Sequence, residues 1–233
     1  MVETIDNFIC LIAGLPGSGK SFSSMTCPPP IFYVDLEKRA EQTKKLYFNN
    51  KEIIIKDCLA FDENYQRDAV KTLANIESAI KELIQLARQD KVRSVVVDGI
   101  SNIRTIVREE WVVKHPNRIR PSNPGDWSDI NRRTESLIFP FINVSRVHKL
   151  NCFLTAWLTS EKVRTSDGTI EEIEKIDVVD WLYFYIDFIF VMKIYEGDFY
   201  SVLVKSPFGV TDMFKVSNQN FFDIIWQKTH GGD

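Results

Sequence analysis

A glycine-rich loop directly after a short apolar run constrains the fold of this chain more than any other feature. Residues 8–14, FICLIAG, have the composition of a buried strand, and residues 14–21, GLPGSGKS, follow at once. They fit the pattern G-x-x-x-x-G-K-[ST], which requires a strand before it and a helix after it. In that setting backbone N–H groups converge on an anion, and the helix N-terminus adds partial positive charge. The segment is therefore predicted to be a P-loop that holds the phosphates of a nucleotide.

The residues of this loop have distinct predicted roles. Lys20 is expected to reach the β- and γ-phosphates of ATP as a point charge, and the Ser21 hydroxyl is expected to coordinate Mg²⁺. The other predicted nucleotide-binding residues are Gly14, Pro16, Gly17, Ser18 and Gly19. A glycine turn beside a surface lysine is the simpler interpretation, and the preceding strand favours the P-loop.

Further strands and helices alternate along the chain. Residues 31–37, 94–100 and 152–157 are runs typical of buried parallel strands, and residues 185–206 alternate around EGD as a β-hairpin does. Residues 72–89 repeat apolar side chains at helical spacing.

A second long helix is expected to begin near Asp126, which would cap its first turn, and to bend at Pro140. The order of strands and helices predicts one α/β domain over residues 1–233, with a mostly parallel central sheet, helices on both faces and a C-terminal β-hairpin.

Composition limits what this domain does. The 29 Lys and Arg against 32 Asp and Glu give a net charge of −3, so contact with nucleic acid or an anionic membrane would need a local patch. Cysteines 10, 27, 58 and 152 lack metal-ligand spacing, which predicts reduced core thiols and a cytoplasmic protein. No apolar run approaches the roughly 18 residues needed to cross a bilayer, so no membrane partner is expected.

Carboxylates end two of the predicted strands. Asp98 lies at the carboxyl end of SVVVD and is predicted to be the Walker B aspartate, which shares the Mg²⁺ site with Ser21. Asp35 and Glu37 end another strand, and alternation would point both the same way, so that one could polarise a water at the γ-phosphate. The alternatives are a helix N-cap at Asp98 and two acids favoured by a helix dipole.

Three of these segments together resemble a known family. IFYVDLEKRAEQTKKLY (31–47), SVVVDGISNI (94–103) and CFLTAWLTSEK (152–162) are similar to the core of the RecA-like recombinase ATPases. Only SFSSMTCPPP separates Lys20 from the second strand, and GDW opens the helix before the fourth. This compact spacing resembles the short RecA-core proteins of phages and archaeal viruses called phage single-strand annealing ATPases. The resemblance covers residues 8–206.

The resemblance implies a RecA-like P-loop NTPase core with Glu37 as the catalytic glutamate. It implies an Mg²⁺-dependent ATP hydrolase, stimulated by single-stranded DNA, that acts in recombination or annealing for a virus and thus in the host cell cytoplasm. It also implies a homo-oligomer with ATP between subunits and a cation supplied in trans, for which Lys205 is the candidate. No N-terminal helix precedes the first strand, so filaments of the recombinase type are not expected. A surface lysine flanking a turn is the simpler interpretation of Lys205.

The γ-phosphate sensor of that family falls on Trp157 here. Tryptophan lacks the hydrogen bonding of a glutamine, so Thr155 and Thr159 are the substitute candidates, against ordinary strand and loop hydroxyls.

Residues 109–133 form a loop-like stretch in which aromatic and basic residues alternate, as suits single-stranded DNA. The candidate DNA-binding residues are Trp111, Lys114, Arg118, Arg120, Trp127, Arg132 and Arg133. The alternative is a solvated connector or lid, and residues 159–177 are expected to be a second loop.

Two other functions fit the same motifs. The first is a P-loop kinase for a nucleoside or nucleotide, with residues 109–133 as a substrate lid. Glu37 argues against it, because a kinase must exclude the water that this glutamate would activate. The second is a nucleotide-dependent assembly module with little turnover.

Overall fold

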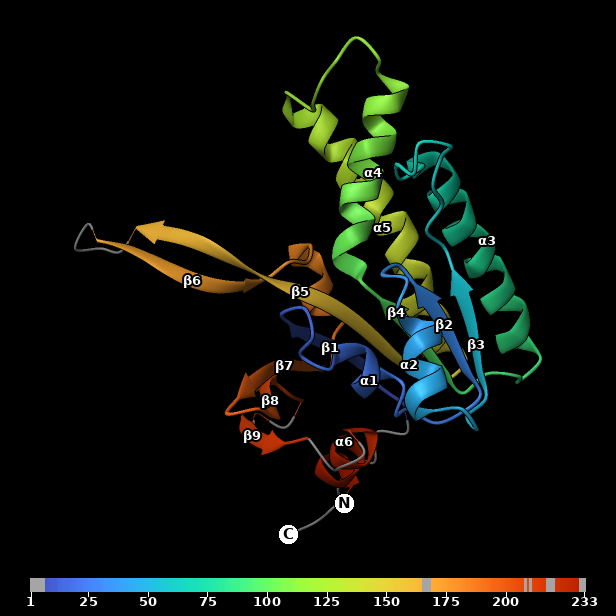
Figure 1. Ribbon diagram of the computed structural model, residues 1–233, viewed down its shortest axis with the longest axis vertical. Helices are drawn as coiled ribbons and strands as arrows, with labels where there is room; N and C mark the ends of the chain where they lie inside the picture. Colours follow the sequence, from blue (N-terminus) through green and yellow to red (C-terminus); the bar gives the residue numbers. More distant parts are fainter. Residues whose placement is uncertain (1–6, 165–168, 208, 210, 217–220, 231–233) are drawn as a thin grey trace.

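Strands and helices alternate along the chain as the sequence predicts (Figure 1). The computed structural model describes residues 7–164, 169–207, 209, 211–216 and 221–230. The strands in this part of the chain are β1 (Ile9–Gly14), β2 (Ile31–Asp35), β3 (Ile53–Asp57), β4 (Ser94–Asp98), β5 (Asn151–Arg164), β6 (Ile170–Ile176), β7 (Phe188–Tyr195), β8 (Asp198–Lys205) and β9 (Asp212–Lys215). The helices are α1 (Lys20–Ser24), α2 (Ala40–Tyr47), α3 (Ala69–Arg88), α4 (Ile100–Lys114), α5 (Pro124–Val147), the 3₁₀ helix η1 (Asp180–Phe184) and α6 (Phe221–His230).

The nine strands of the described residues form one sheet in the order β3-β2-β4-β5-β1-β7-β8-β9, with β6 paired to β5 outside this path. Neighbouring strands from β3 to β7 are parallel, and β8 and β9 follow antiparallel. The predicted hairpin is β7–β8, which turns through Glu196 and Gly197, with φ of 51° and 84°. The predicted α/β class and its C-terminal hairpin are confirmed.

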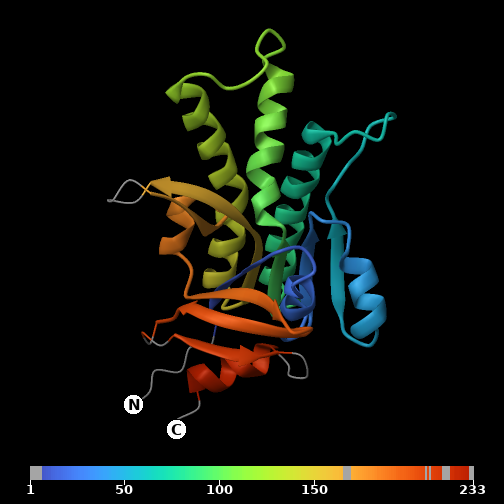
Figure 2. The same cartoon turned by 60° about the vertical axis from the view of Figure 1, so that its left-hand side comes forward.

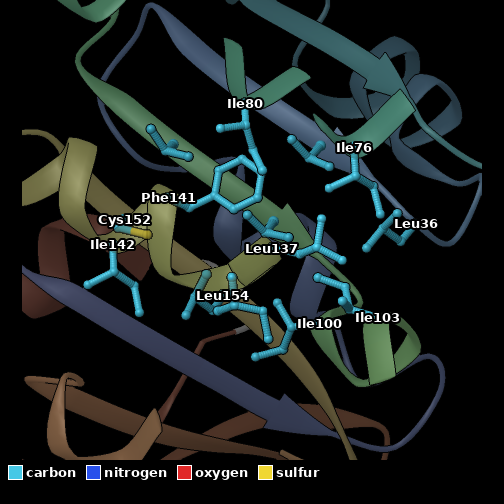
Figure 3. Close-up of a cluster of buried hydrophobic side chains, with 14 of the residues drawn as sticks. Leu36, Ile76, Ile80, Ile100, Ile103, Leu137, Phe141, Ile142, Cys152 and Leu154 are labelled. Atoms are coloured by element: carbon cyan, nitrogen blue, oxygen red, sulfur yellow. The ribbon is translucent and has the colours of Figure 1, made fainter. Parts of the chain in front are cut away.

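Helices cover both faces of this sheet (Figures 1 and 2). In β1, Ile9 and Leu11 face a core shared with α3, α4 and α5, whereas Cys10 and Ile12 face a second core that includes α6. Figure 3 shows part of the first core, where the labelled side chains are Leu36, Ile76, Ile80, Ile100, Ile103, Leu137, Phe141, Ile142, Cys152 and Leu154. The central strands are therefore buried on both sides, which explains why their sequences are almost continuously apolar.

Helix α5 begins two residues earlier than the sequence predicts. Asn123, and not Asp126, is the N-cap: its side chain accepts a 2.9 Å hydrogen bond from the Asp126 N–H. Asp126 occupies the third helical position, and its carboxylate accepts from the Asn123 N–H in return. This reciprocal capping box satisfies two N–H groups that the helix itself leaves without partners. Pro140 lies inside the helix.

Two stretches predicted to be loops are largely regular structure. Residues 109–114 belong to α4 and residues 124–133 to α5, so only 115–123 connect the two helices. Most of 159–177 forms the antiparallel β5–β6 hairpin, which projects from the body of the molecule (Figure 1). Residues 165–168 of that stretch lie outside the described residues.

The remaining expectations concern thiols, membranes and chain ends. All four cysteines are free and buried, as predicted. Among the described residues, no helix has the length and apolar character to span a bilayer. The expectation of one domain covers residues 1–233, and that of no helix before β1 covers residues 1–6. Residues 1–6 and 231–233 are not described, so both expectations stay predictions. The elements that the sequence patterns did not predict are β3, α2, η1, β9 and α6.

Candidate nucleotide-binding site

The carboxyl ends of four parallel strands bring the predicted site residues to one edge of the sheet. β1 and β5 are in register with Gly14 beside Trp157, and β2 and β4 with Asp35 beside Asp98. β5 lies between β1 and β4 in the sheet. Ligands of open α/β sheets bind at such an edge.

The loop after β1 has the backbone of a phosphate cradle. Gly19 has a φ of 90°, a left-handed conformation that L side chains rarely adopt, and α1 starts at the next residue. The Ser18 hydroxyl is buried, and no described atom forms a hydrogen bond with its oxygen. A buried hydroxyl without a partner costs free energy unless a ligand supplies one. The loop therefore fits a bound phosphate.

The ammonium group of Lys20 folds back onto this loop. Its Nζ donates to the carbonyl oxygens of Gly14, at 3.0 Å, and Leu15, at 3.1 Å. Burial lowers the pKa of Lys20, and the nearby carboxylates of Glu37 and Asp98 oppose that shift. The lysine is thus a buried cation held by weak neutral acceptors, which phosphate oxygens can replace.

Three side-chain hydroxyl groups donate hydrogen bonds to the Asp98 carboxylate. Its Oδ2 accepts from Ser21 Oγ at 2.7 Å and from the Tyr33 hydroxyl at 2.6 Å, and its Oδ1 accepts from Thr155 Oγ1 at 2.5 Å. Burial, followed by the Asp98 charge, raises the pKa of Tyr33, which keeps this phenol protonated as a donor. The Ser21–Asp98 contact joins the two predicted Mg²⁺ ligands.

The two candidate sensor threonines have different surroundings. The Thr155 hydroxyl donates to Asp98 and accepts a 2.8 Å hydrogen bond from the Gly99 N–H, so its single proton is already used. Thr155 thus orients Asp98. Thr159 is exposed on the β5–β6 hairpin and donates to the Lys175 carbonyl at 3.4 Å. A sensor role for either stays a prediction.

Asp35 and Glu37 do not point the same way, because β2 ends at Asp35 and strand alternation stops there. The Asp35 carboxylate is buried and accepts from the backbone N–H groups of Glu37, Lys38 and Ala40 at 2.8–2.9 Å. It therefore fixes the turn that leads into α2. Glu37 lines the cavity beside the P-loop.

Trp157 holds Glu37 in place, a contact that the sequence did not predict. Its indole Nε1 donates a 2.6 Å hydrogen bond to Glu37 Oε1, and its backbone N–H donates to Ser101 Oγ at 3.0 Å. Burial raises the pKa of Glu37 and the Asp98 charge adds to this, whereas the Trp157 hydrogen bond lowers it. The raised pKa makes Glu37 a stronger proton acceptor than an exposed carboxylate.

Gly99 gives Glu37 the space that it occupies. Its φ of 93° is left-handed, and a Cβ on this residue would lie 2.9 Å from Glu37 Cγ. The glycine directly after Asp98 therefore leaves the space that the Glu37 side chain occupies. The signal in the sequence was a glycine directly after Asp98.

Helices α4 and α5 form an arm whose tip, residues 109–133, lies away from α1 (Figures 1 and 2). All the candidate DNA-binding residues fall within this range. Trp111 is only 6% exposed and stacks on His115 at 4.1 Å between ring centroids. The other tryptophan, Trp127, is 37% exposed, and Arg104 lies over its ring. Trp111 is therefore a packing residue in this conformation, and Trp127 is the accessible one.

The cations of this arm are mostly paired within the chain. The pairs are Lys114–Glu110, Arg118–Asp126, Arg132–Asp129 and Arg133–Glu77. Within the part of the chain that the structure describes, Arg120 has no ion-pair partner. Elsewhere, the Lys205 ammonium donates to the carbonyl oxygens of Tyr183 and Ile186, at 2.7 Å and 2.6 Å.

Together, the strand–loop–helix cradle, its lysine and the Ser21–Asp98 pair define a P-loop NTPase. The model of an AAA domain family, AAA_24, matches residues 6–182, and the chain belongs to this family. A comparison with curated proteins gives no match. The domain is therefore a nucleotide-binding ATPase domain of the AAA type, a class that binds ATP, usually with Mg²⁺.

Proposed function

We propose that this protein hydrolyses Mg²⁺·ATP with Glu37 as general base, and that it couples hydrolysis to single-stranded DNA in recombination or annealing. The observation that carries the proposal is the 2.6 Å hydrogen bond by which Trp157 orients Glu37 at the cavity that Lys20 also lines. A carboxylate fixed in this way, with a raised pKa, is suited to take a proton from an attacking water.

Each residue of the site has a defined task in this reaction. Lys20 would exchange the carbonyls of Gly14 and Leu15 for phosphate oxygens, and the Ser18 hydroxyl would gain the partner that it lacks among the described residues. Ser21 and Asp98 would hold Mg²⁺, which when bound neutralises the charge that develops on the phosphates. Glu37 would accept the proton of the water.

The proposed DNA site is the tip of the α4–α5 arm. Its support is the exposed ring of Trp127 together with Arg120 and the ion-paired arginines, whose guanidinium groups could exchange carboxylates for phosphates. The resemblance to the phage single-strand annealing ATPases favours the same target and a viral source, hence the host cytoplasm.

We also propose a homo-oligomer with the nucleotide near a subunit boundary. Lys205 would act in trans only after releasing its two carbonyl acceptors, Tyr183 and Ile186. The size of the protein in solution, measured with and without a non-hydrolysable ATP analogue, tests this. A size that does not change and equals that of a monomer contradicts the proposal.

The decisive experiment measures phosphate release from ATP with and without single-stranded DNA. Lys20→Ala should lose hydrolysis and ATP affinity, whereas Glu37→Gln should bind Mg²⁺·ATP and lose turnover by about 10²-fold or more. DNA should stimulate the wild type. Phosphoryl transfer to a nucleoside or nucleotide would instead make the protein a kinase, and binding without turnover would make it an assembly module.

A further inference from the structure

The cavity beside the P-loop extends beyond the residues that would hold phosphates. Its volume is about 520 Å³, and its lining includes the P-loop, Lys20 and Glu37. Apolar and aromatic side chains from α1, α2 and the last strands also line it, namely Phe22, Tyr47, Met192, Phe199 and Val216. A cavity that has both anion-binding groups and apolar walls fits a ligand with a charged part and an apolar part.

Phe199 of β8 is a wall residue of the cavity that lies close to the phosphate cradle. A Cβ at Gly19 would lie 3.5 Å from Cδ1 of the Phe199 ring and 3.9 Å from Cε of Met192. The Phe199 side chain is nevertheless 36% exposed. An aromatic ring that lies beside the P-loop, lines the cavity and is partly exposed is placed to meet whatever is joined to the phosphates.

The lining of the cavity includes a second exposed ring. Tyr47, at the end of α2, is 65% exposed and meets Phe22 edge to face, with 5.3 Å between ring centroids. Phe22 directly follows Ser21 at the start of α1. Aromatic side chains from two distant parts of the chain therefore gather around this one cavity.

The wall that carries Phe199 is joined rigidly to the P-loop strand. Met192 of β7 pairs with Gly14 of β1, and the Val216 N–H donates to the Phe199 carbonyl at 2.8 Å. These strands lie after residue 182, outside the part of the chain that the family model matches. The C-terminal strands thus complete a nucleotide cavity that the matched region begins.

We propose that Phe199 and Tyr47 form a base-binding subsite, in which the purine ring of a nucleoside triphosphate stacks on Phe199 while the P-loop holds its phosphates. This inference rests on the proposed nucleotide binding and adds its specificity. A flat heterocycle gains from stacking on an aromatic face, and the two-ring purine covers more apolar surface than a pyrimidine. The wild type therefore prefers ATP and GTP over CTP, and CTP over bare tripolyphosphate.

The test is calorimetric titration of the full chain with Mg²⁺ and ATP, GTP, CTP or tripolyphosphate. Phe199→Ala should weaken ATP binding by about 5- to 150-fold and leave tripolyphosphate binding unchanged, and Phe199→Trp should keep ATP affinity. Tyr47→Ala should act in the same direction as Phe199→Ala. Val204→Ala is the matched control, because Val204 is an exposed residue of the same strand that does not line the cavity.

The outcomes separate this inference from the function on which it rests. Equal affinity of the wild type for ATP and tripolyphosphate, or unchanged ATP affinity in Phe199→Ala, overturns the base subsite and leaves the phosphate site intact. A wild type that binds neither ligand overturns both. Equal loss of ATP and tripolyphosphate binding in Phe199→Ala, with a lowered melting temperature, assigns Phe199 to the fold and also overturns the proposal.

Discussion

The indole nitrogen of Trp157 donates a 2.6 Å hydrogen bond to Oε1 of Glu37. The two residues are distant in sequence and meet because β5 lies next to β4 and β4 next to β2. The contact fixes a flexible side chain at the cavity that the P-loop lines. A general base must be within reach of its proton in a defined orientation, so this bond links strand order to the proposed role of Glu37.

Trp157→Phe should lower kcat about 10- to 100-fold, the value of one hydrogen bond to a charged group. It should also move the acid limb of the kcat/KM profile to higher pH. Glu37 must be ionised to accept a proton, and the Trp157 hydrogen bond lowers its pKa against burial and Asp98, so removing the donor raises that pKa further. Phosphate release measured across pH checks both effects.

Trp127→Phe is the matched control, because Trp127 is also 37% exposed but lies in α5 on the arm. Its ATP hydrolysis without DNA should equal that of the wild type. An unchanged pH profile in Trp157→Phe, or a higher kcat, would show that Trp157 does not assist Glu37.

The Thr155 hydroxyl supports Asp98, so its removal should weaken the metal site. Thr155→Val leaves the Asp98 carboxylate with one donor fewer and the Gly99 N–H without its acceptor, both buried. We expect a loss of about 1–3 kcal/mol in the free energy of unfolding and a higher Mg²⁺ concentration for half-maximal hydrolysis. Urea unfolding and Mg²⁺ titration measure the two quantities.

Thr155→Ser is the control for this change, since it keeps the hydroxyl and removes only the methyl group. It should retain the wild-type Mg²⁺ dependence. If valine and serine variants show the same Mg²⁺ dependence, the hydroxyl does not act through Asp98.

Gly99→Ala should reduce turnover while ATP still binds. The added Cβ would lie 2.9 Å from Glu37 Cγ, which forces the carboxylate away from its position. Gly197→Ala is the control, because Gly197 has a similar φ of 84° and nothing within 4 Å of an added Cβ. Both variants should lose about 1–2 kcal/mol of stability from the left-handed backbone. Only Gly99→Ala should lose hydrolysis, and equal hydrolysis in the two variants would contradict the role of Gly99.

Local patterns were enough to predict the centre of the fold. The strands that end at Gly14 and Asp98 are continuous apolar runs because both faces of the sheet are covered, and such runs are readable without tertiary information. The strand Ile53–Asp57 was missed because it lies at the sheet edge, where only Ile53 is buried and the charged residues Lys56 and Asp57 end the strand. The prediction of loops at residues 109–133 and 159–177 was largely wrong, because polar and charged residues occur on exposed helices and hairpins as well as in loops.

The residues of the site also fall into two groups, those that local sequence patterns predict and those that depend on strand order. The P-loop and Asp98 follow from spacing within one segment, which a sequence displays directly. The roles of Trp157, Thr155 and Gly99 depend on which strands are neighbours, and the sequence does not state strand order. Alternation also gave the wrong orientation for Asp35, since the strand ends there and its carboxylate binds three backbone N–H groups instead.

In the α4–α5 arm, the ion pairs decide which arginine variants test DNA binding without changing stability. Arg120 has no ion-pair partner among the described residues, so Arg120→Ala should weaken single-stranded DNA binding without loss of stability. The log–log salt slope should flatten by about 0.7 per lost phosphate contact. Arg118→Ala should also weaken binding, but Arg118 pairs with Asp126 at the start of α5, so its melting temperature should fall as well.

The two tryptophans of the arm should differ from each other, although the sequence made both of them DNA-binding candidates. Trp127→Ala should cost about 1–3 kcal/mol of DNA binding with the salt slope preserved, because its exposed ring can stack on a base. Trp111→Ala should lower the melting temperature first, because this ring is buried against His115.

Fluorescence anisotropy of labelled single-stranded DNA over a salt series, with thermal unfolding of each variant, measures all of these effects. Arg88→Ala, at the exposed end of α3, is the control for nonspecific charge. Full DNA affinity and an unchanged salt slope in Arg120→Ala and Trp127→Ala would make the arm a structural connector, and the proposed DNA coupling would then have no site on it.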